Sequence, residues 1–134
     1  MRCHVLTPMK TPDSPVPSGD RTIARLLVVA LRRLGFEPQL VSSLVSRLQD
    51  GSAAEIAELR DRAHREVERI VRQDSPSLVF TYHVYYRAPD LIGPELGRRF
   101  GVPYVVAEGS RSPKQAHGPF AEGHRLAERA RDRA

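Results

Sequence analysis

The sequence predicts an α/β fold, a Rossmann-like three-layer domain around a parallel sheet of about four strands. Three observations lead to this prediction. Short apolar runs that suit buried strands alternate along the chain with longer segments of helical periodicity. The chain has 11 prolines and 9 glycines, which imply substantial loops between these segments. A length of 134 residues with 40% hydrophobic and 28% charged residues is typical of one globular domain with its own core.

The first strand is expected at residues 4–7 and the first helix at residues 21–34. Between them, residues 8–20 form a loop rich in proline and serine. Ser18 or Asp20 suits the N-cap of the helix, because a short polar side chain there can accept a hydrogen bond from a free backbone N–H. This strand, loop and helix are the unit beside which the rest of the chain is expected to lie.

Apolar residues recur every three or four positions in the first helix, which predicts one buried face. Val28 and Val29 widen this face, so the helix is expected to be covered on more than one side. Gly35 follows as a residue that can take the left-handed conformation closing a helix. The predicted buried residues are Ile23, Leu26, Leu27, Ala30, Leu31 and Leu34.

The second strand is expected at residues 36–42, and a long second helix follows Ser52. Ser52 and Glu55 have the spacing of a capping box, in which each side chain accepts a hydrogen bond from the other residue's amide. The helix is expected to end before Pro76, which disfavours helical geometry in the residue preceding it. Its predicted buried face is Ile56, Leu59, Ala63, Val67 and Ile70, and its predicted exposed pairs are Glu58 with Arg62, Asp61 with Arg65 and Glu68 with Arg72.

The remaining elements continue the alternation. The third strand is expected at residues 78–82 and the fourth at residues 104–107. A short helix between them begins at the pair 93–94, where proline suits the first turn, and stops at Gly101. Residues 120–133 form a final helix with Phe120, Leu126, Ala127 and Ala130 facing inward.

Composition excludes several classes of function. The formal charge of +5 comes almost entirely from arginines, many of which have acidic neighbours one helical turn away. No zinc spacing or RNA-binding signature is present, so no nucleic-acid partner is expected. The histidines show no metal-ligand spacing, so no metal site is expected. The single Cys3 suits a buried structural thiol. With no signal peptide or membrane-length apolar run, the expected location is cytoplasmic, with peripheral contact at an anionic membrane face left open.

Candidate site residues lie where the strands end. A strand order of 2-1-3-4 would bring the loops after the first and third strands together across a crevice. The Ser18-Gly19 turn, His83 and Glu108 would then share one rim. Gly19 and the amides after it could receive an anion, or Ser18 and Asp20 simply cap the helix. His83 suits a general base or a packing residue, and Glu108 a reactive carboxylate or a loop cap.

Tyr85, Tyr86 and Arg87 form a second candidate cluster, directly after His83. Their aromatic rings and guanidinium group can stack on a sugar or a base. Packing within the loop explains them equally well. We therefore retain them as candidate substrate-binding residues.

Three blocks of the chain resemble a known family. Residues 17–22, 80–90 and 101–108 are similar in content and order to the amino-terminal half of a glycosyltransferase of family 4 type with the GT-B fold. The resemblance implies a first Rossmann-like domain for the acceptor and a second for the nucleotide-sugar, which is a co-substrate, with no obligatory cofactor or metal. It implies an acceptor-side domain over residues 1–110, then a polar connection and terminal helix over 111–134, truncated before the donor-binding domain.

The resemblance also implies roles for the candidate residues. Ser18, Gly19 and Asp20 would border the donor diphosphate, and the ends of the third and fourth strands would face the acceptor hydroxyl. Many members have a histidine where Glu108 stands, so Glu108 is its positional substitute and His83 its neighbour. The expected function is sugar transfer to a hydroxyl acceptor by a longer protein, the fragment itself being inactive. The alternative is a non-catalytic Rossmann-like module that binds a ligand or a protein.

Overall fold

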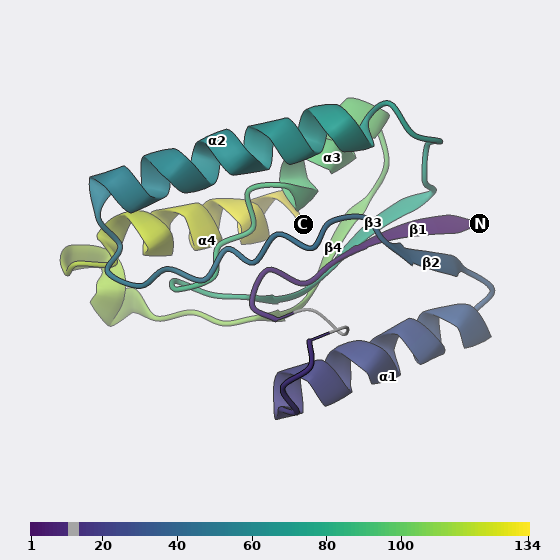
Figure 1. The fold of residues 1–134 in the computed structure, drawn as a ribbon, viewed down its shortest axis with the longest axis horizontal. Helices are drawn as coiled ribbons and strands as arrows, with labels where there is room; N and C mark the ends of the chain where they lie inside the picture. The colour runs from purple at the N-terminus through teal and green to yellow at the C-terminus, as the bar shows by residue number, and fades with distance from the viewer. Residues whose placement is uncertain (11–13) are drawn as a thin grey trace.

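A computed structural model describes residues 1–10 and 14–134. Its four strands form one parallel sheet in the order β2-β1-β3-β4, which confirms the predicted α/β fold and strand order (Figure 1). The strands are β1 (Arg2–Leu6), β2 (Glu37–Leu40), β3 (Leu78–Val84) and β4 (Tyr104–Gly109). Residues 11–13 of the predicted first loop lie outside the described residues.

The helices cover the two faces of the sheet unequally. One face carries α1 (Gly19–Arg33), and the other carries α2 (Ala53–Ile70), α3 (Gly93–Phe100) and α4 (Ala121–Arg133) (Figure 1). A short 3-10 helix, η1 (Pro113–His117), precedes α4. The result is the predicted three-layer arrangement, with the sheet between two layers of helix.

Several boundaries differ from the predicted ones by a few residues. The second strand ends at Leu40, although Val41 beyond it is still buried. The third strand continues through His83 to Val84. The helix α2 ends at Ile70, several residues before the proline that was expected to stop it.

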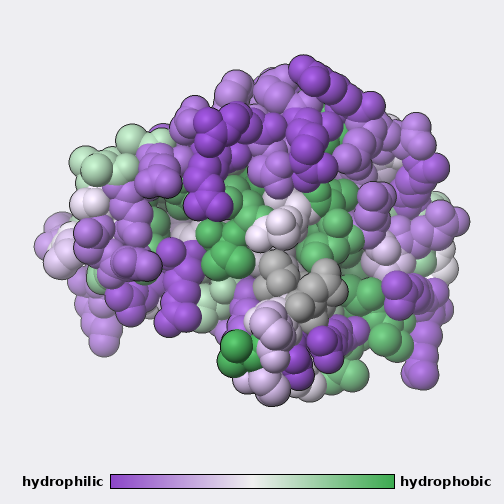
Figure 2. All heavy atoms as spheres, in the orientation of Figure 1, coloured by the Kyte–Doolittle hydropathy of each residue, from purple (hydrophilic) through white to green (hydrophobic). Residues whose placement is uncertain are grey.

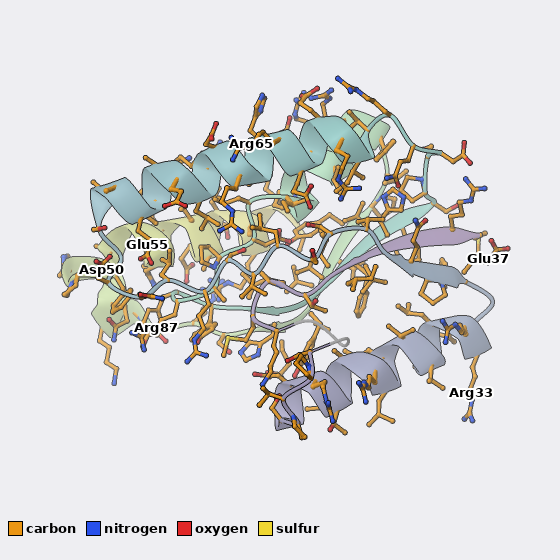
Figure 3. All side chains as sticks on the ribbon, in the orientation of Figure 1. Arg33, Glu37, Asp50, Glu55, Arg65 and Arg87 are labelled. Carbon is orange, nitrogen blue, oxygen red and sulfur yellow. The ribbon has the colours of Figure 1, made fainter. Side chains whose placement is uncertain are left out.

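The helix α2 buries the face that its periodicity predicts. Ile56, Leu59, Ala63, Val67 and Ile70 are its buried residues, and each is at most 6% exposed. Arg65 lies on the outer side of α2 (Figure 3) and donates to Asp61 at 2.7 Å, as predicted. Glu68, in contrast, accepts its hydrogen bond from Arg99 of α3 at 2.8 Å instead of from Arg72. Helix α2 therefore contacts its neighbour through charge as well as through the core.

The start of α2 confirms half of the predicted capping box and corrects the other half. Ser52 Oγ accepts from Glu55 N at 3.1 Å, as expected of an N-cap. The Glu55 carboxylate, however, accepts from the amides of Gln49, Asp50 and Gly51 at 2.8, 3.2 and 2.8 Å, while Ser52 N donates to Asp50 Oδ1. The chain bends back before the helix, so three upstream amides reach the carboxylate first (Figure 3).

The helix α1 buries a different face from the predicted one. Ala24 and Leu31 are buried, and Leu27 and Val28 are partly buried against the sheet. The prediction was wrong for four positions, because Ile23, Leu26 and Leu34 are 43%, 62% and 72% exposed and Ala30 is also exposed. The expected cover on more than one side is also wrong among the described residues. Of the elements that the structure describes, α1 is the one helix on its face of the sheet (Figure 1), and only its side toward the sheet is buried.

A buried carboxylate organises the start of α3. Asp90 is 4% exposed and accepts from the hydroxyls of Thr81 and Tyr104 at 2.7 Å each, and from the amides of Ile92 and Gly93 at 3.0 and 2.8 Å. Burial, and then the Asp90 charge, raise the pKa of Tyr104. A Cβ at Gly93 would collide with Asp90 and Tyr104. Glycine at this position therefore allows the helix to approach the strands closely.

The predicted inward face of the final helix is confirmed for its central residues. Leu126, Ala127 and Ala130 are buried against α2 and the sheet, and Phe120 is partly buried. Cys3 is fully buried, and burial raises its pKa to about 11, as expected of a structural thiol. Figure 2 shows hydrophilic residues spread over α2, with apolar residues appearing between α2 and α1. Across the described residues, every helix is too short or too polar to cross a membrane.

Candidate functional site

The candidate site lies at the carboxyl edge of the sheet, where β1, β3 and β4 end beside the start of α1. Ser18 is the N-cap of α1, as one of the two predicted alternatives: its Oγ accepts from Arg21 N at 3.2 Å. The backbone around Gly19 is open, since a Cβ there would meet no heavy atom within 4 Å. The Ser18-Gly19 turn therefore forms an accessible wall of the site.

Asp20 is not the cap of its helix and instead contacts the end of β3. Its Oδ1 lies 2.9 Å from His83 Nδ1 and accepts from the Tyr82 hydroxyl at 3.2 Å. An ionised carboxylate can only accept, so His83 Nδ1 carries the proton in this contact. In the neutral ring, the other nitrogen, Nε2, then carries the lone pair. The Asp20 and His83 side chains are 24% and 21% exposed, which leaves both within reach of a ligand.

Tyr82 remains a donor in this arrangement. Burial, followed by the charge of Asp20 and the hydrogen bond to it, raises the pKa of Tyr82 to about 12, with a smaller effect from Glu108. The phenol therefore keeps its proton at neutral pH and continues to donate to Asp20. Asp20 is held in place from two sides, by the phenol and by the imidazole.

His83 and Glu108 are backbone outliers at matching positions of adjacent strands. Their φ angles are 68° and 64°, and they are the only residues other than glycine with positive φ among those described. Tyr82 pairs with Ala107 and Val84 with Gly109, so the register places His83 against Glu108. Left-handed geometry costs a non-glycine residue roughly 1–2 kcal/mol. Such strain is concentrated at functional sites, where surrounding structure holds it in place.

The three candidate substrate-binding residues divide between two places. Tyr85 lies beside the site: its ring is 5.1 Å from that of His83, and its hydroxyl donates to Met9 Sδ. Tyr86 and Arg87 contact Phe120 instead, Tyr86 edge-on and Arg87 with its guanidinium 4.6 Å from the ring centroid. Tyr85 is thus the member of this cluster that contacts the candidate site directly.

One further polar residue at this edge was not predicted to have a role. Thr7 follows β1, is 3% exposed, and its hydroxyl makes no hydrogen bond to any described residue. A buried hydroxyl without a partner is unusual, because it gives up its bonds to water. The signal in the sequence was a single polar residue closing an apolar strand, which is too common to indicate a site.

The arrangement suits proton abstraction from a hydroxyl group. A hydrogen-bonded Asp–His pair orients the imidazole and stabilises the imidazolium that forms when Nε2 takes a proton. Glu108, on the neighbouring strand, adds a carboxylate at the same edge. Within residues 1–10 and 14–134, no three His, Cys, Asp or Glu side chains converge as a metal site would require.

Comparisons of the chain with protein-family models, with curated proteins and with solved structures find no match. The fold and the site geometry therefore rest on the chain itself. The similarity of three blocks of sequence to family 4 glycosyltransferases stays a prediction from the residues.

Proposed function

We propose that this chain is the acceptor-side domain of a glycosyltransferase that transfers a sugar from a nucleotide-sugar to a hydroxyl group. One observation carries the proposal: the Asp20–His83 pair, 2.9 Å apart, lies at the carboxyl edge of a parallel sheet, beside the strained Glu108. Ligands of open α/β sheets bind at this edge, where the strand order changes direction. A paired imidazole there is well placed to meet an acceptor hydroxyl.

In the proposed reaction, His83 Nε2 takes the proton of the acceptor hydroxyl, and Asp20 stabilises the resulting imidazolium. The acceptor oxygen forms a bond to the anomeric carbon of the sugar. The bond from that carbon to the donor diphosphate breaks, and the diphosphate leaves with the electron pair. Glu108 would accept a hydrogen bond from the acceptor and orient it. Ser18 and Gly19 would border the diphosphate, which a second domain holds.

The proposal is tested by binding, because the acceptor-side domain alone is expected not to turn over. We suggest two-dimensional NMR titration of the chain with a panel of monosaccharides, glycosides and polyols, followed by nucleotide-sugars. Acceptor compounds should shift the signals of His83, Tyr85 and Glu108. His83→Gln should weaken this binding about tenfold, since it removes the imidazole that contacts the hydroxyl. His117→Gln is the matched control, because His117 is exposed and lies in η1.

Two outcomes would contradict the proposal. Shifts that cluster away from the carboxyl edge would place the ligand elsewhere, and equal binding by the His83 and His117 variants would remove His83 from the site. Sugar transfer by the 134-residue chain alone would contradict the proposal that catalysis needs a second, donor-binding domain.

One observation favours the alternative of a non-catalytic Rossmann-like binding module. A bare apolar flank on the last helix would suit contact with a donor-binding domain, yet Leu126, Ala127 and Ala130 are each at most 3% exposed. That flank is already covered by α2 and the sheet. A simple binding module need not recognise an acceptor hydroxyl, so it would bind a sugar with methylated hydroxyls as tightly as the parent sugar, whereas the acceptor-side domain should bind the methylated sugar more weakly.

A further inference from the structure

A cavity lies on the opposite side of the sheet from α1, away from the candidate site. It is partly open to solvent and has a volume of about 430 Å³ between α2, α3 and α4. Its inner surface is aliphatic and comes from Ala63, Val67, Leu91, Leu126 and Ala130. This volume is within the range of cavities that bind small molecules. None of the residues discussed for the carboxyl edge lines it, so it is a separate feature of the fold.

Arginines from all three helices surround the cavity: Arg60 of α2, Arg98 and Arg99 of α3, and Arg129 and Arg133 of α4. Three of them are engaged in ion pairs, in which Arg60 contacts Glu122, Arg98 contacts Glu95 and Arg99 contacts Glu68. Arg129 and Arg133 make no ion-pair contact with any residue that the structure describes, although the charge of Arg133 helps to lower the pKa of Glu95, which also lines the cavity. Two guanidinium groups on α4 are therefore available to a ligand.

Two carboxylates line the cavity, and each has partners of its own: Glu95 pairs with Arg98, and Asp90 is buried. Asp90 lines the cavity, but its oxygens accept four hydrogen bonds from Thr81, Tyr104, Ile92 and Gly93. Its charge is thus held by its own network. A ligand anion would meet the arginines of the rim, where the two unpaired groups lie.

The lining indicates what kind of anion fits. Guanidinium groups bind phosphate and carboxylate through paired hydrogen bonds, which a charged head group provides. Among the residues that the structure describes, no phenylalanine, tyrosine or tryptophan lines the cavity, so it offers no ring of that kind for a nucleotide base to stack on. Its aliphatic floor suits a hydrocarbon chain instead. We infer that this cavity binds an amphipathic anion, an alkyl or acyl chain that carries a phosphate or carboxylate head.

Calorimetric titration with alkyl phosphates of six, eight and ten carbons, below their micelle concentrations, tests the inference. Each added methylene should tighten one-to-one binding about fourfold until the chain fills the cavity. NMR shifts should fall on Val67, Leu126 and Ala130. Alkyl carboxylates of equal length identify the preferred head group, and binding of either one supports the inference.

The arginine variant separates the cavity from general charge attraction. Arg129→Gln with Arg133→Gln should weaken binding of octyl phosphate at least about tenfold, because both head-group donors are lost. Arg32→Gln with Arg33→Gln is the matched control: it removes the same charge from the last turn of α1 and should leave binding within about twofold. All four side chains lie at the surface, apart from the core, so circular dichroism should show both variants folded.

Three results would overturn the inference. Inorganic phosphate binding as tightly as octyl phosphate would show that the hydrocarbon chain has no site. Equal weakening by the two double variants would show attraction to the whole charged surface. Binding to phosphatidylglycerol vesicles, without binding to monomeric alkyl phosphates, would show that the protein contacts a membrane surface and does not bind a single amphipathic anion in the cavity.

Discussion

The two faces of the sheet are covered by different numbers of helices. On one face, α2, α3 and α4 pack beside one another, and α2 buries one clean stripe of five apolar residues. On the other face, α1 is the one helix among the described residues; it buries Ala24 and Leu31, while Ile23, Leu26, Val29 and Leu34 stay exposed. Helix α2 has its large apolar residues on the side that it buries, whereas α1 has large apolar residues on sides that stay exposed. The comparison shows that the apolar content of a helix does not by itself measure its burial.

The largest expected effect is a difference in stability loss between truncating a buried apolar residue of α2 and truncating an exposed one of α1. Ile70→Ala should lower the free energy of unfolding by about 2–5 kcal/mol, because Ile70 is fully buried in the core under α2. Leu26→Ala on α1 should change it by less than about 0.5 kcal/mol, because Leu26 is 62% exposed. Urea denaturation of both variants measures the difference. Equal losses would mean that α1 is covered in solution.

Substitutions at the starts of the two helices should change stability by a smaller amount. Glu55→Ala should cost about 2 kcal/mol, since its carboxylate accepts hydrogen bonds from three amides before α2. Ser18→Ala should cost about 1 kcal/mol, since it removes one cap bond from α1. Thermal unfolding of each variant gives the ranking. A larger loss for Ser18→Ala would show that α1, despite its open face, depends more on its start than α2 does.

The smallest expected effects concern how the free energy of unfolding depends on pH. One face of the sheet contributes stability that is lost at low pH, and the other contributes stability that is lost at high pH. On the three-helix face, the guanidinium of Arg125, with Arg60, lowers the pKa of Glu122 from 4.5 to about 2. This stabilisation is present above pH 4.5 and is lost as the pH falls toward 2, but it is small because the Glu122 side chain is 38% exposed. Glu122→Gln should flatten this acid limb in melting temperatures measured against pH. An unchanged acid limb would contradict the pairing.

On the α1 face, Tyr82 contributes stability that is lost at alkaline pH. Its pKa is raised from 10.0 to about 12, so its contribution is complete below pH 10 and is lost as the pH rises toward 12. Tyr82→Phe should flatten this alkaline limb without altering the acid one. A variant that loses both limbs together would indicate general unfolding and not the titration of one phenol.

Much of the fold was predictable because it depends on local pattern. The stripe of α2 could be assigned correctly since apolar residues occupy only one side of that helix. The apolar residues of α1 lie on several sides of the helix, so their spacing alone could not predict which side packs against the sheet. The ion pair between Glu68 and Arg99 joins two helices, and a rule for residues four apart cannot find it.

The candidate site was predictable in outline but not in its central contact. Strand order placed Ser18, His83 and Glu108 at one edge, because the ends of parallel strands meet there. Asp20 and His83 are 63 positions apart, and an aspartate at a helix start suits a cap equally well. The left-handed backbone of His83 and Glu108 also has no signal in residue type, since neither is a glycine.

The protonation of His83 tests the central claim most directly, because the proposed chemistry needs a free lone pair on Nε2. ¹⁵N NMR of the histidine rings, assigned with His83→Gln, shows which nitrogen carries the proton in the neutral ring. We predict a proton on Nδ1 in the wild type, held by Asp20 at 2.9 Å, and loss of that preference in Asp20→Ala. A proton on Nε2 in the wild type, or the same pattern in both proteins, would contradict the account.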